Sequence, residues 1–237
     1  MTAGPYAALV AAHGLSPAHR LLLDAVPAGA RTLDVGCATG YLAAVLAARG
    51  GAVVGIEHDT AAAAAAGASG AFERVLAGDV EDGASRAELR GLAPFDALVC
   101  GDVLEHLRDP WAALAFLATL LAPDGRAAIS VPNVAHWTGR RALLGGRFPY
   151  AEHGLFDRTH LRFLTRVSAR AMVEAAGLRV VAERFAPAPL PLQARIPILA
   201  RLEPAAARAW PELFALQFVL VAAPALSGPS RPDRASR

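Results

Sequence analysis

Apolar runs of strand length alternate with helix-like patterns along most of this chain. Seven such runs begin at Arg31, and most are separated by stretches with apolar residues at helical spacing. The last two runs follow one another after a proline-rich segment, a pattern typical of a late hairpin that carries an antiparallel strand. The alternation predicts an α/β fold: a doubly wound, mostly parallel seven-stranded sheet with helices on both faces. The predicted strands are residues 31–35, 52–57, 73–78, 95–101, 126–133, 178–184 and 214–222.

Residues that commonly start and stop helices support this scheme. Asp109 and Pro110 form an N-cap and first-turn pair before an apolar run. Thr165 can cap the next amphipathic stretch, and Gly177 ends it.

One domain is expected from 237 residues, because this length is sufficient for a single well-buried α/β core. We predict that residues 1–224 form this domain, with residues 1–30 as an N-terminal helical cover and residues 225–237 as a disordered tail. Residues 134–164 and 186–212 do not fit the alternation, and we interpret both as lid insertions near the carboxyl ends of strands. The proline-rich insertion is equally compatible with a cover over a sheet edge.

Charge and cysteine content change this picture little. All 23 basic residues are arginine and the net charge is +2, so no nucleic-acid partner is indicated. The only cysteines, Cys37 and Cys100, lie inside the motifs described below, which argues against a disulfide and for a reducing compartment. No signal peptide or transmembrane segment is recognisable, so we expect a soluble, cytoplasmic protein. The oligomeric state stays open.

The stretch TLDVGCATGYLAAVLA, residues 32–47, carries the first candidate site. Gly36 and Gly40 let the backbone pass close to a ligand between a strand and a helix. Their spacing, with Ala38 between them, differs from the G-x-G-x-x-G of dinucleotide loops. Asp34 at the mouth of the strand would repel a pyrophosphate but could take a cationic ligand. The loop therefore predicts a small, positively charged ligand.

Acids at the next two strand ends complete the pattern. Glu57 could accept both hydroxyls of a ribose, and Asp79 could accept an adenine amino hydrogen. Acids at the ends of three successive strands predict binding of S-adenosyl-L-methionine.

The chain resembles the class I S-adenosylmethionine-dependent methyltransferases, which have a Rossmann-like fold. LDVGCATG, VVGIEHD, AGDVED, FDALVCGDVLEHLRDPWAAL and LAPDGRAAISVPN follow the family's order, and VPNVAHW, GLFDRTHLRFLTR and FALQFVLVA resemble a bacterial small-molecule subgroup. The chain departs from the family at Ala38, where glycine is usual. The resemblance implies that the cofactor is bound by Asp34, Gly36, Cys37, Gly40, Glu57, Asp79, Val80, Cys100 and Gly101.

The candidate catalytic residues follow the fourth strand. Asp102, Glu105 and His106 stand at i, i+3 and i+4, so a helix here would place them on one face. Alignment of nucleophile, methyl group and sulfur does most of the work in methyl transfer, and a hydroxyl acceptor also benefits from a base. We expect His106 to be that base, with Asp102 beside it. A solvated helix start, or a histidine that only fixes hydrogen bonds, is the alternative.

A metal site is a second hypothesis for the same segment. Asp102, Glu105, His106 and the distant His160 resemble the cation-binding arrangement of small-RNA 2′-O-methyltransferases, and quinone-pathway O-methyltransferases have a similar segment. Here Asp102 replaces the family's first glutamate and shortens the reach. Mixed oxygen and imidazole ligands suit Mn²⁺, Zn²⁺ or Fe²⁺ better than Mg²⁺. Such a cation could lower the pKa of the acceptor hydroxyl.

The predicted function is O-methylation of a small molecule, such as a phenol or a sugar hydroxyl of a glycan or secondary metabolite. The alternatives are RNA 2′-O-methylation, a MetW-like protein of methionine biosynthesis acting through a partner acyltransferase, and a silent cofactor-binding module. His136 and Trp137 belong either to the acceptor pocket or to a packed Trp beside an exposed His. The apolar residues 191–204 would suit a hydrophobic acceptor or core packing. Arginines at four-residue spacing, Arg158, Arg162, Arg166 and Arg170, favour a solvated face over an anion-binding stripe.

Overall fold

The computed structural model describes residue 10 and residues 12–225, and a seven-stranded sheet runs through them. The predicted tail beyond residue 225 lies outside the described residues, as do residues 1–9 and 11 of the predicted N-terminal cover. The strands are β1 (Thr32–Val35), β2 (Val53–Glu57), β3 (Arg74–Ala77), β4 (Phe95–Gly101), β5 (Leu121–Pro132), β6 (Leu178–Pro187) and β7 (Ala215–Pro224).

The strand order is β3-β2-β1-β4-β5-β7-β6, and β7 is antiparallel to both of its neighbours. The remaining adjacent pairs are parallel, so the prediction of a mostly parallel sheet with a late antiparallel strand is confirmed. The order reverses between β1 and β4, and ligands of doubly wound sheets bind outside the carboxyl ends of the strands at such a switch point.

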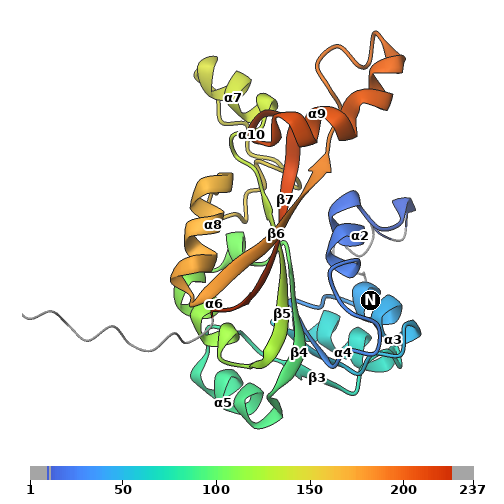
Figure 1. The fold of residues 1–237 in the computed structure, drawn as a ribbon, viewed down its shortest axis with the longest axis vertical. Helices are drawn as coiled ribbons and strands as arrows, with labels where there is room; N and C mark the ends of the chain where they lie inside the picture. The colour runs from blue at the N-terminus through green and yellow to red at the C-terminus, as the bar shows by residue number, and fades with distance from the viewer. Residues whose placement is uncertain (1–9, 11, 226–237) are drawn as a thin grey trace, which may run out of the picture.

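Helices cover both faces of the sheet, as Figure 1 shows. α2, α3 and α4 lie on one side, and α5, α6 and α8 lie on the other. The helices are α2 (Pro17–Leu23), α3 (Tyr41–Ala48), α4 (Thr60–Ala68), α5 (Gly83–Leu92), α6 (Pro110–Ala118), α7 (Trp137–Leu144), α8 (Arg166–Ala175), α9 (Glu203–Ala209) and α10 (Pro211–Phe214), with short 3-10 turns η1 (Leu104–His106) and η2 (Pro197–Leu202).

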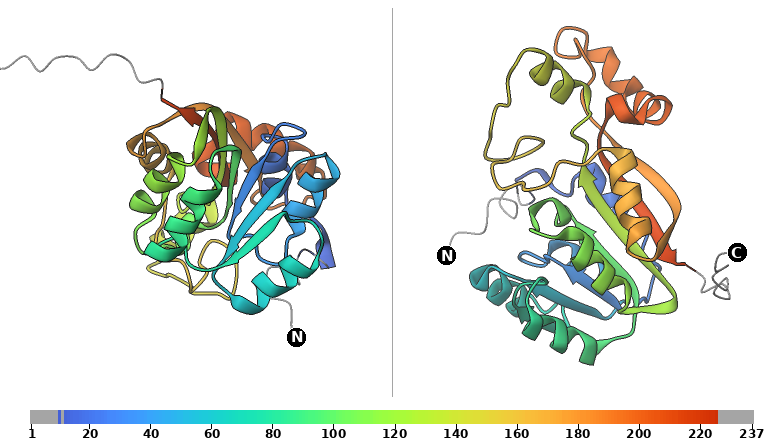
Figure 2. Two further views of the ribbon diagram at one scale, coloured as in Figure 1. Left: turned by 90° about the horizontal axis from the view of Figure 1, so that it is seen from below. Right: turned by 90° about the vertical axis from the view of Figure 1, so that its left-hand side faces the viewer.

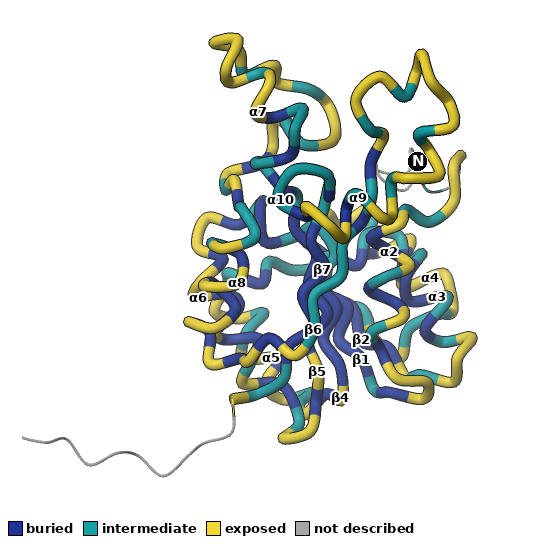
Figure 3. The backbone as a smooth tube through the Cα atoms, turned by 45° about the horizontal axis from the view of Figure 1, so that its top comes forward, coloured by how far each residue is buried: buried dark blue, intermediate teal, exposed yellow. Residues whose placement is uncertain are grey.

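The core consists of one apolar layer on each face of the sheet. Strand residues such as Leu33 and Leu98 pack with α6 and α8 on one face, while Val53 and Val99 pack with α2 and α3 on the other. The buried centre therefore coincides with β1, β4, β5 and β7, as the dark tube in Figure 3 shows. Burial on both faces explains why the strands are continuous apolar runs rather than alternating ones.

The predicted helix boundaries are confirmed. The side chain of Asp109 accepts from Ala112 N at 3.0 Å at the start of α6. Thr165 and Ser168 cap α8 reciprocally, and Gly177 follows that helix with a φ of 80°. These contacts satisfy backbone groups that the helix ends would otherwise leave unpaired.

Two strands, β5 and β6, extend three or more residues beyond a predicted end. β5 begins at Leu121 because the Pro-Asp-Gly sequence at 123–125 forms an irregularity within the strand, with a register shift opposite Phe95 and Ala97, instead of a turn before it. β6 continues to Pro187, into the predicted lid. A proline is tolerated there because β6 is the edge strand and pairs only with β7.

The two insertions project beyond the same end of the sheet, as Figure 1 and the right-hand view of Figure 2 show. Residues 134–164 contain α7, and residues 188–214 contain η2, α9 and α10. The indole Nε1 of Trp137 donates to the Pro189 carbonyl at 3.2 Å and so joins the two insertions. Among the described residues, no helix has both the length and the apolar character needed to cross a membrane.

Candidate functional site

The loop between β1 and α3 is shaped by three residues with positive φ. Gly36 and Gly40 have φ values of 66° and 89°, and Ala38 has 48°. A Cβ on Gly36 would lie 2.6 Å from Val103 Cγ2, and one on Gly40 would lie 2.7 Å from Phe72 Cε2. Glycine is therefore required at both positions by backbone conformation and by close packing.

Asp34 lies below this loop at the end of β1 and is 1% exposed. Its Oδ2 atom has no hydrogen-bond partner among the described residues. Burial, and to a lesser extent the nearby Glu57, raises the pKa of Asp34 to about 7. Gly40, which precedes α3, offers no side-chain cap to that helix. An unpartnered buried acid beside uncapped backbone N–H groups fits a ligand that carries both a cation and hydrogen-bond acceptors.

Glu57 connects the loop to the end of β2. Its Oε2 accepts from Ala38 N at 2.9 Å, and its Oε1 accepts from Asp59 N at 2.9 Å. The His58 Nδ1 atom also lies 2.9 Å from Oε1. A carboxylate has about four lone-pair positions, so Glu57 retains capacity for a hydroxyl donor.

The other predicted cofactor residues differ in how open they are. Asp79 is half-exposed and accepts from Glu81 N at 2.8 Å, while Val80 is buried beside it. Cys100 is buried, which raises its pKa to about 12, and Gly101 ends β4. The Cys37 side chain points toward β2, and its Sγ would lie 2.7 Å from a Cβ built on Gly55 of that strand. Contact of these residues with the cofactor stays a prediction.

The segment after β4 does not form the helix that would place Asp102, Glu105 and His106 on one face. Asp102 has a φ of 56° and lies outside η1, so the prediction that it shares a helical face with Glu105 and His106 is wrong. Its left-handed conformation turns its carboxylate toward β5 and β7. Ser130 Oγ donates to Oδ1 at 2.6 Å, and Gln217 Nε2 lies 2.7 Å from each oxygen.

Glu105, His106 and His160 come together even though 54 residues separate the two histidines. Their candidate ligand atoms all lie within 4.8 Å of one another, and the two imidazole centroids are 4.7 Å apart. Asp102, which we had grouped with them, is not part of this cluster. The cluster forms because the Glu105 carbonyl accepts from Leu161 N and Arg162 N, at 2.8 and 3.0 Å.

Both side-chain oxygens of Glu105 are buried without a hydrogen-bond partner among the described residues, and the residue is 1% exposed. Burial, followed by the charges of Asp102 and Asp157, raises the pKa of Glu105 well above its usual value. Burial, followed by His106, lowers the pKa of His160. A divalent cation would fit this donor set, because it would satisfy an otherwise unpartnered carboxylate and two imidazoles.

The ring of His106 is oriented by Thr159. Nδ1 lies 3.3 Å from the Thr159 carbonyl oxygen and 3.1 Å from its hydroxyl. A carbonyl only accepts, so this contact favours the neutral tautomer with the proton on Nδ1. The unprotonated Nε2 is then the basic nitrogen. Asp157 in turn fixes Thr159, since its Oδ1 accepts from the Thr159 amide and hydroxyl.

A cavity of about 620 Å³ opens beside this cluster. Asp102, Glu105 and His160 line it together with Gln217 from β7 and His19 from α2. Sequence reasoning missed His19 and Gln217, because neither belongs to a motif and both reach the cavity only through the fold. Burial, as the largest effect, lowers the pKa of His19. The backbone N–H of Ser16 donates to its Nδ1 at 3.3 Å.

Several other candidates lie away from this cavity. His136 is 2% exposed, so the alternative of an exposed histidine is wrong, and burial lowers its pKa to about 4. The four arginines at regular spacing do not form an anion-binding stripe. Arg158, Arg166 and Arg170 pair with glutamates, and Arg162 donates to the Arg108 carbonyl.

The sequence profile of a family described as "Methyltransferase domain" matches residues 11–183. Over 159 residues, which are 64% of each chain, this chain is 30% identical to a ubiquinone biosynthesis O-methyltransferase of Aeromonas salmonicida. Over 179 residues, which are 71% of each chain, it is 32% identical to the protein of the same name from Xanthomonas axonopodis pv. citri.

Solved structures share the fold. An S-adenosylmethionine-dependent methyltransferase from Archaeoglobus fulgidus has a TM-score of 0.64 at 17% identity, over 92% of this chain and 99% of that one. The magnesium protoporphyrin IX methyltransferase of Synechocystis with bound S-adenosylhomocysteine has a TM-score of 0.57 at 18% identity, over 87% and 80%. At these identities the likeness concerns the fold alone.

Proposed function

Because this chain belongs to the S-adenosylmethionine-dependent methyltransferases, we propose that it methylates a hydroxyl group of a small molecule, either a phenol or a sugar hydroxyl. The names of the ubiquinone biosynthesis O-methyltransferases support oxygen as the accepting atom. The observation that carries the proposal is the cluster of Glu105, His106 and His160, in which Glu105 and His160 line the 620 Å³ cavity and the His106 ring packs against His160. A carboxylate in the cavity wall, with an imidazole next to it, supports deprotonation of a hydroxyl acceptor.

The cofactor supplies a methyl group already activated on a sulfonium. The chain's own residues therefore have to bind the cofactor, align the acceptor with the methyl group and deprotonate the acceptor hydroxyl. Asp34 and the loop at residues 36–40 hold the positively charged end, and Glu57 holds the ribose. Asp102, fixed by Ser130 and Gln217, forms a rigid edge between cofactor and acceptor. His106 accepts the hydroxyl proton on Nε2 while Thr159 keeps its Nδ1 side occupied.

A divalent cation held by Glu105, His106 and His160 is the variant of this proposal that the unpartnered Glu105 oxygens favour. Bound there, the cation would lower the pKa of the acceptor hydroxyl. The two variants differ in what His106 does, since it is a base in one and a ligand in the other.

The test is formation of S-adenosylhomocysteine from a panel of phenols and sugars, with wild-type protein and His106→Ala. We expect His106→Ala to lower kcat by about 10²- to 10⁴-fold, the usual contribution of a general base, with an unchanged Kd for S-adenosylhomocysteine. Product formation at the wild-type rate by the variant would contradict the role of His106. Co-purification of an acyltransferase, without product from any acceptor, would favour the partner-dependent alternative.

Metal dependence is tested separately on chelator-stripped protein. If the cation is required, Mn²⁺ restores activity and binds with a stoichiometry near one, and Glu105→Gln abolishes that binding. Glu174→Gln, an exposed glutamate on α8, is the matched control and should bind Mn²⁺ as the wild type does. Full activity after prolonged EDTA treatment, with no response to Mn²⁺, leaves His106 as the base and overturns the metal variant.

A further inference from the structure

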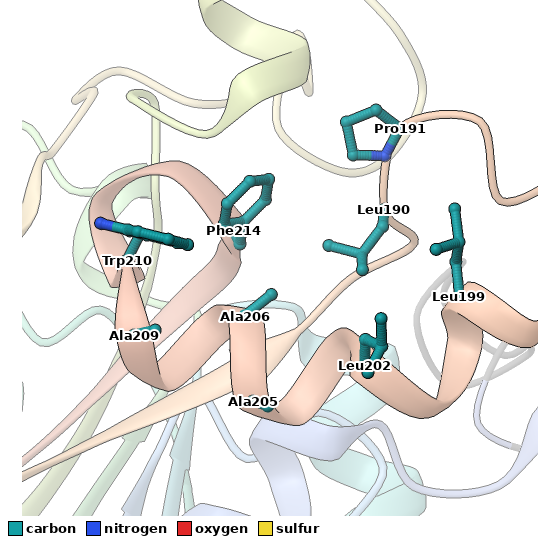
Figure 4. A pocket seen from close by; sticks show the side chains of 9 residues that line it. All are labelled: Leu190, Pro191, Leu199, Leu202, Ala205, Ala206, Ala209, Trp210 and Phe214. Carbon is teal, nitrogen blue, oxygen red and sulfur yellow. The ribbon is translucent and has the colours of Figure 1, made fainter.

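The segment between β6 and β7 exposes an apolar surface that core packing does not explain. Residues 188–214 bend away from the sheet, and α9 buries only Ala207. A groove of about 380 Å³ runs between the start of this segment and its helices, as Figure 4 shows. The residues that line it are all of apolar types, and the largest are Leu190, Leu199, Leu202, Trp210 and Phe214.

Large hydrophobic side chains also project outward from this segment. Five of the thirteen exposed large hydrophobic residues in the described chain fall within its residues 192–210, and Trp210 is 65% exposed. Scattered single hydrophobic residues are normal on a surface, but a concentration of this kind marks an interaction site. The five are Leu192, Ile196, Ile198, Leu202 and Trp210.

The insertion that contains α7 adds to the same surface. Leu143, Leu144 and Tyr150 are exposed there, and Leu144 is 90% exposed. α7 and α9 lie at the same end of the molecule in Figure 1 and in the right-hand view of Figure 2. The hydrogen bond from Trp137 to Pro189 connects the two insertions. Together they form a single apolar end beside the acceptor cavity.

Arginines outnumber acids on this end. Residues 134–164 contain five arginines and two acids, and residues 188–214 contain three arginines and two acids. Two of these acids, Glu152 and Glu212, pair with Arg158 and Arg166. Six of the eight arginines lie outside residues 152–164. All six arginines are exposed. None of them forms an ion pair with a residue that the structure describes. The six are Arg140, Arg141, Arg147, Arg195, Arg201 and Arg208.

We infer that this apolar, arginine-rich end docks on the surface of a lipid bilayer that carries anionic headgroups. Leucine, isoleucine and tryptophan side chains would enter the interfacial region, while arginines around them contact lipid phosphates. Pairing with a second copy of the chain is less favourable, because a symmetric contact would bring the same arginines together. Docking would turn the acceptor cavity toward the membrane. The inference stands independently of which acceptor is methylated.

The first test is co-sedimentation of the full chain with vesicles. One set contains phosphatidylcholine only, and the other contains equal parts of phosphatidylcholine and phosphatidylglycerol. We expect binding to the mixed vesicles that weakens with salt, since exposed charges are screened. The tryptophan emission of the wild type should shift to shorter wavelength on binding, and Trp210→Phe should reduce that shift while Trp111→Phe, on α6, retains it.

Two matched double variants locate the docking surface. Arg195→Gln with Arg201→Gln should weaken vesicle binding by roughly 25-fold, about five-fold per arginine. Arg126→Gln with Arg179→Gln removes two exposed arginines from strand positions outside the two insertions and should change binding less than two-fold. Circular dichroism and thermal unfolding verify that both variants fold.

Three results would overturn the inference. The first is equal binding of the wild type to both kinds of vesicle, and the second is an equal loss of vesicle binding in both double variants. The third is a concentration-dependent dimer that is altered in the Arg195/Arg201 variant, with no vesicle binding by the wild type or the variant. The third would assign the surface to self-association.

Discussion

The two halves of the candidate site, a cofactor side and an acceptor side, are built in different ways. On the cofactor side, the polar contacts join residues close in sequence, such as Ala38 N and Glu57 Oε2, which are 19 residues apart. On the acceptor side, Asp102 and Gln217 are 115 residues apart, and His106 and Thr159 are 53 apart. The contacts of the first half are made by β1, β2 and the loops at their ends, and its remaining predicted residues lie at the ends of β3 and β4. The second needs α2, β5, β7 and a long insertion.

This difference indicates which half can vary independently. The cofactor loop is confined by backbone conformation and by packing of its glycines against Val103 and Phe72. The acceptor side takes its polar groups from segments that loops deliver to the cavity, and loops tolerate insertion and change better than the sheet does. Each half also holds one buried, unpartnered acid, Asp34 and Glu105, so the two halves can be tested against one another.

The largest expected effect concerns Asp34. Its pKa is about 7 in the folded protein and near 3.8 in the unfolded chain, so the folded state holds a proton that the unfolded state releases. Stability is therefore greatest below the unfolded pKa and falls as pH rises through about 7. Between pH 5 and 8, the free energy of unfolding of the ligand-free protein should fall by about 3 kcal/mol through this group.

Asp34→Asn should remove that pH dependence, which chemical denaturation at several pH values would measure. The affinity of the wild type for S-adenosylhomocysteine, whose amino group is cationic, should increase as pH rises through 7. The affinity of the variant should show no such trend. The same pH slope in both proteins would show that Asp34 is already ionised in the fold.

A smaller effect is expected at Gln217, which tests the long-range half. Gln217→Leu removes the amide that contacts both Asp102 oxygens at 2.7 Å and leaves Ser130 in place. Hydrogen bonds to a charged group contribute about 2 kcal/mol, so kcat/KM should fall roughly thirty-fold if Asp102 must be held. Ser130→Ala is the comparison on the other side of the same carboxylate. Unchanged kinetics in both variants would mean that β7 does not position the site.

The smallest effect is expected at Ala38, which tests the local half. Its φ of 48° is unfavourable for a residue with a Cβ, so Ala38→Gly should raise stability by at most about 1 kcal/mol, which is about 2–4 °C in Tm. Ala44→Gly, at an exposed position on α3, is the matched control and should lower stability by about the same amount. A destabilised Ala38→Gly variant would show that the alanine methyl group contributes to packing.

Strand and helix positions were predictable because burial on both faces of the sheet leaves continuous apolar runs, and caps such as Asp109 and Thr165 mark helix starts. The ends of β5 and β6 were not, because a strand irregularity and an edge proline have the same sequence signals as turns. The loop at 36–40 and the acids at 34, 57 and 79 could be proposed from spacing alone, since each lies at or near the end of its own strand. His19 and Gln217 could not, because no local pattern distinguishes them from ordinary helix and strand residues.

By itself, the sequence determined the sheet, the cofactor family and the presence of Glu105, His106 and His160 as candidates. Periodicity and strand-end chemistry are local properties, and the chain records them directly. Only the tertiary structure decided that Asp102 turns away to Ser130 and Gln217, because that depends on a left-handed backbone conformation and on a strand 115 residues later. It also decided that residues 191–204 are exposed instead of packed in the core, because the edge strand before them directs the segment away from the sheet.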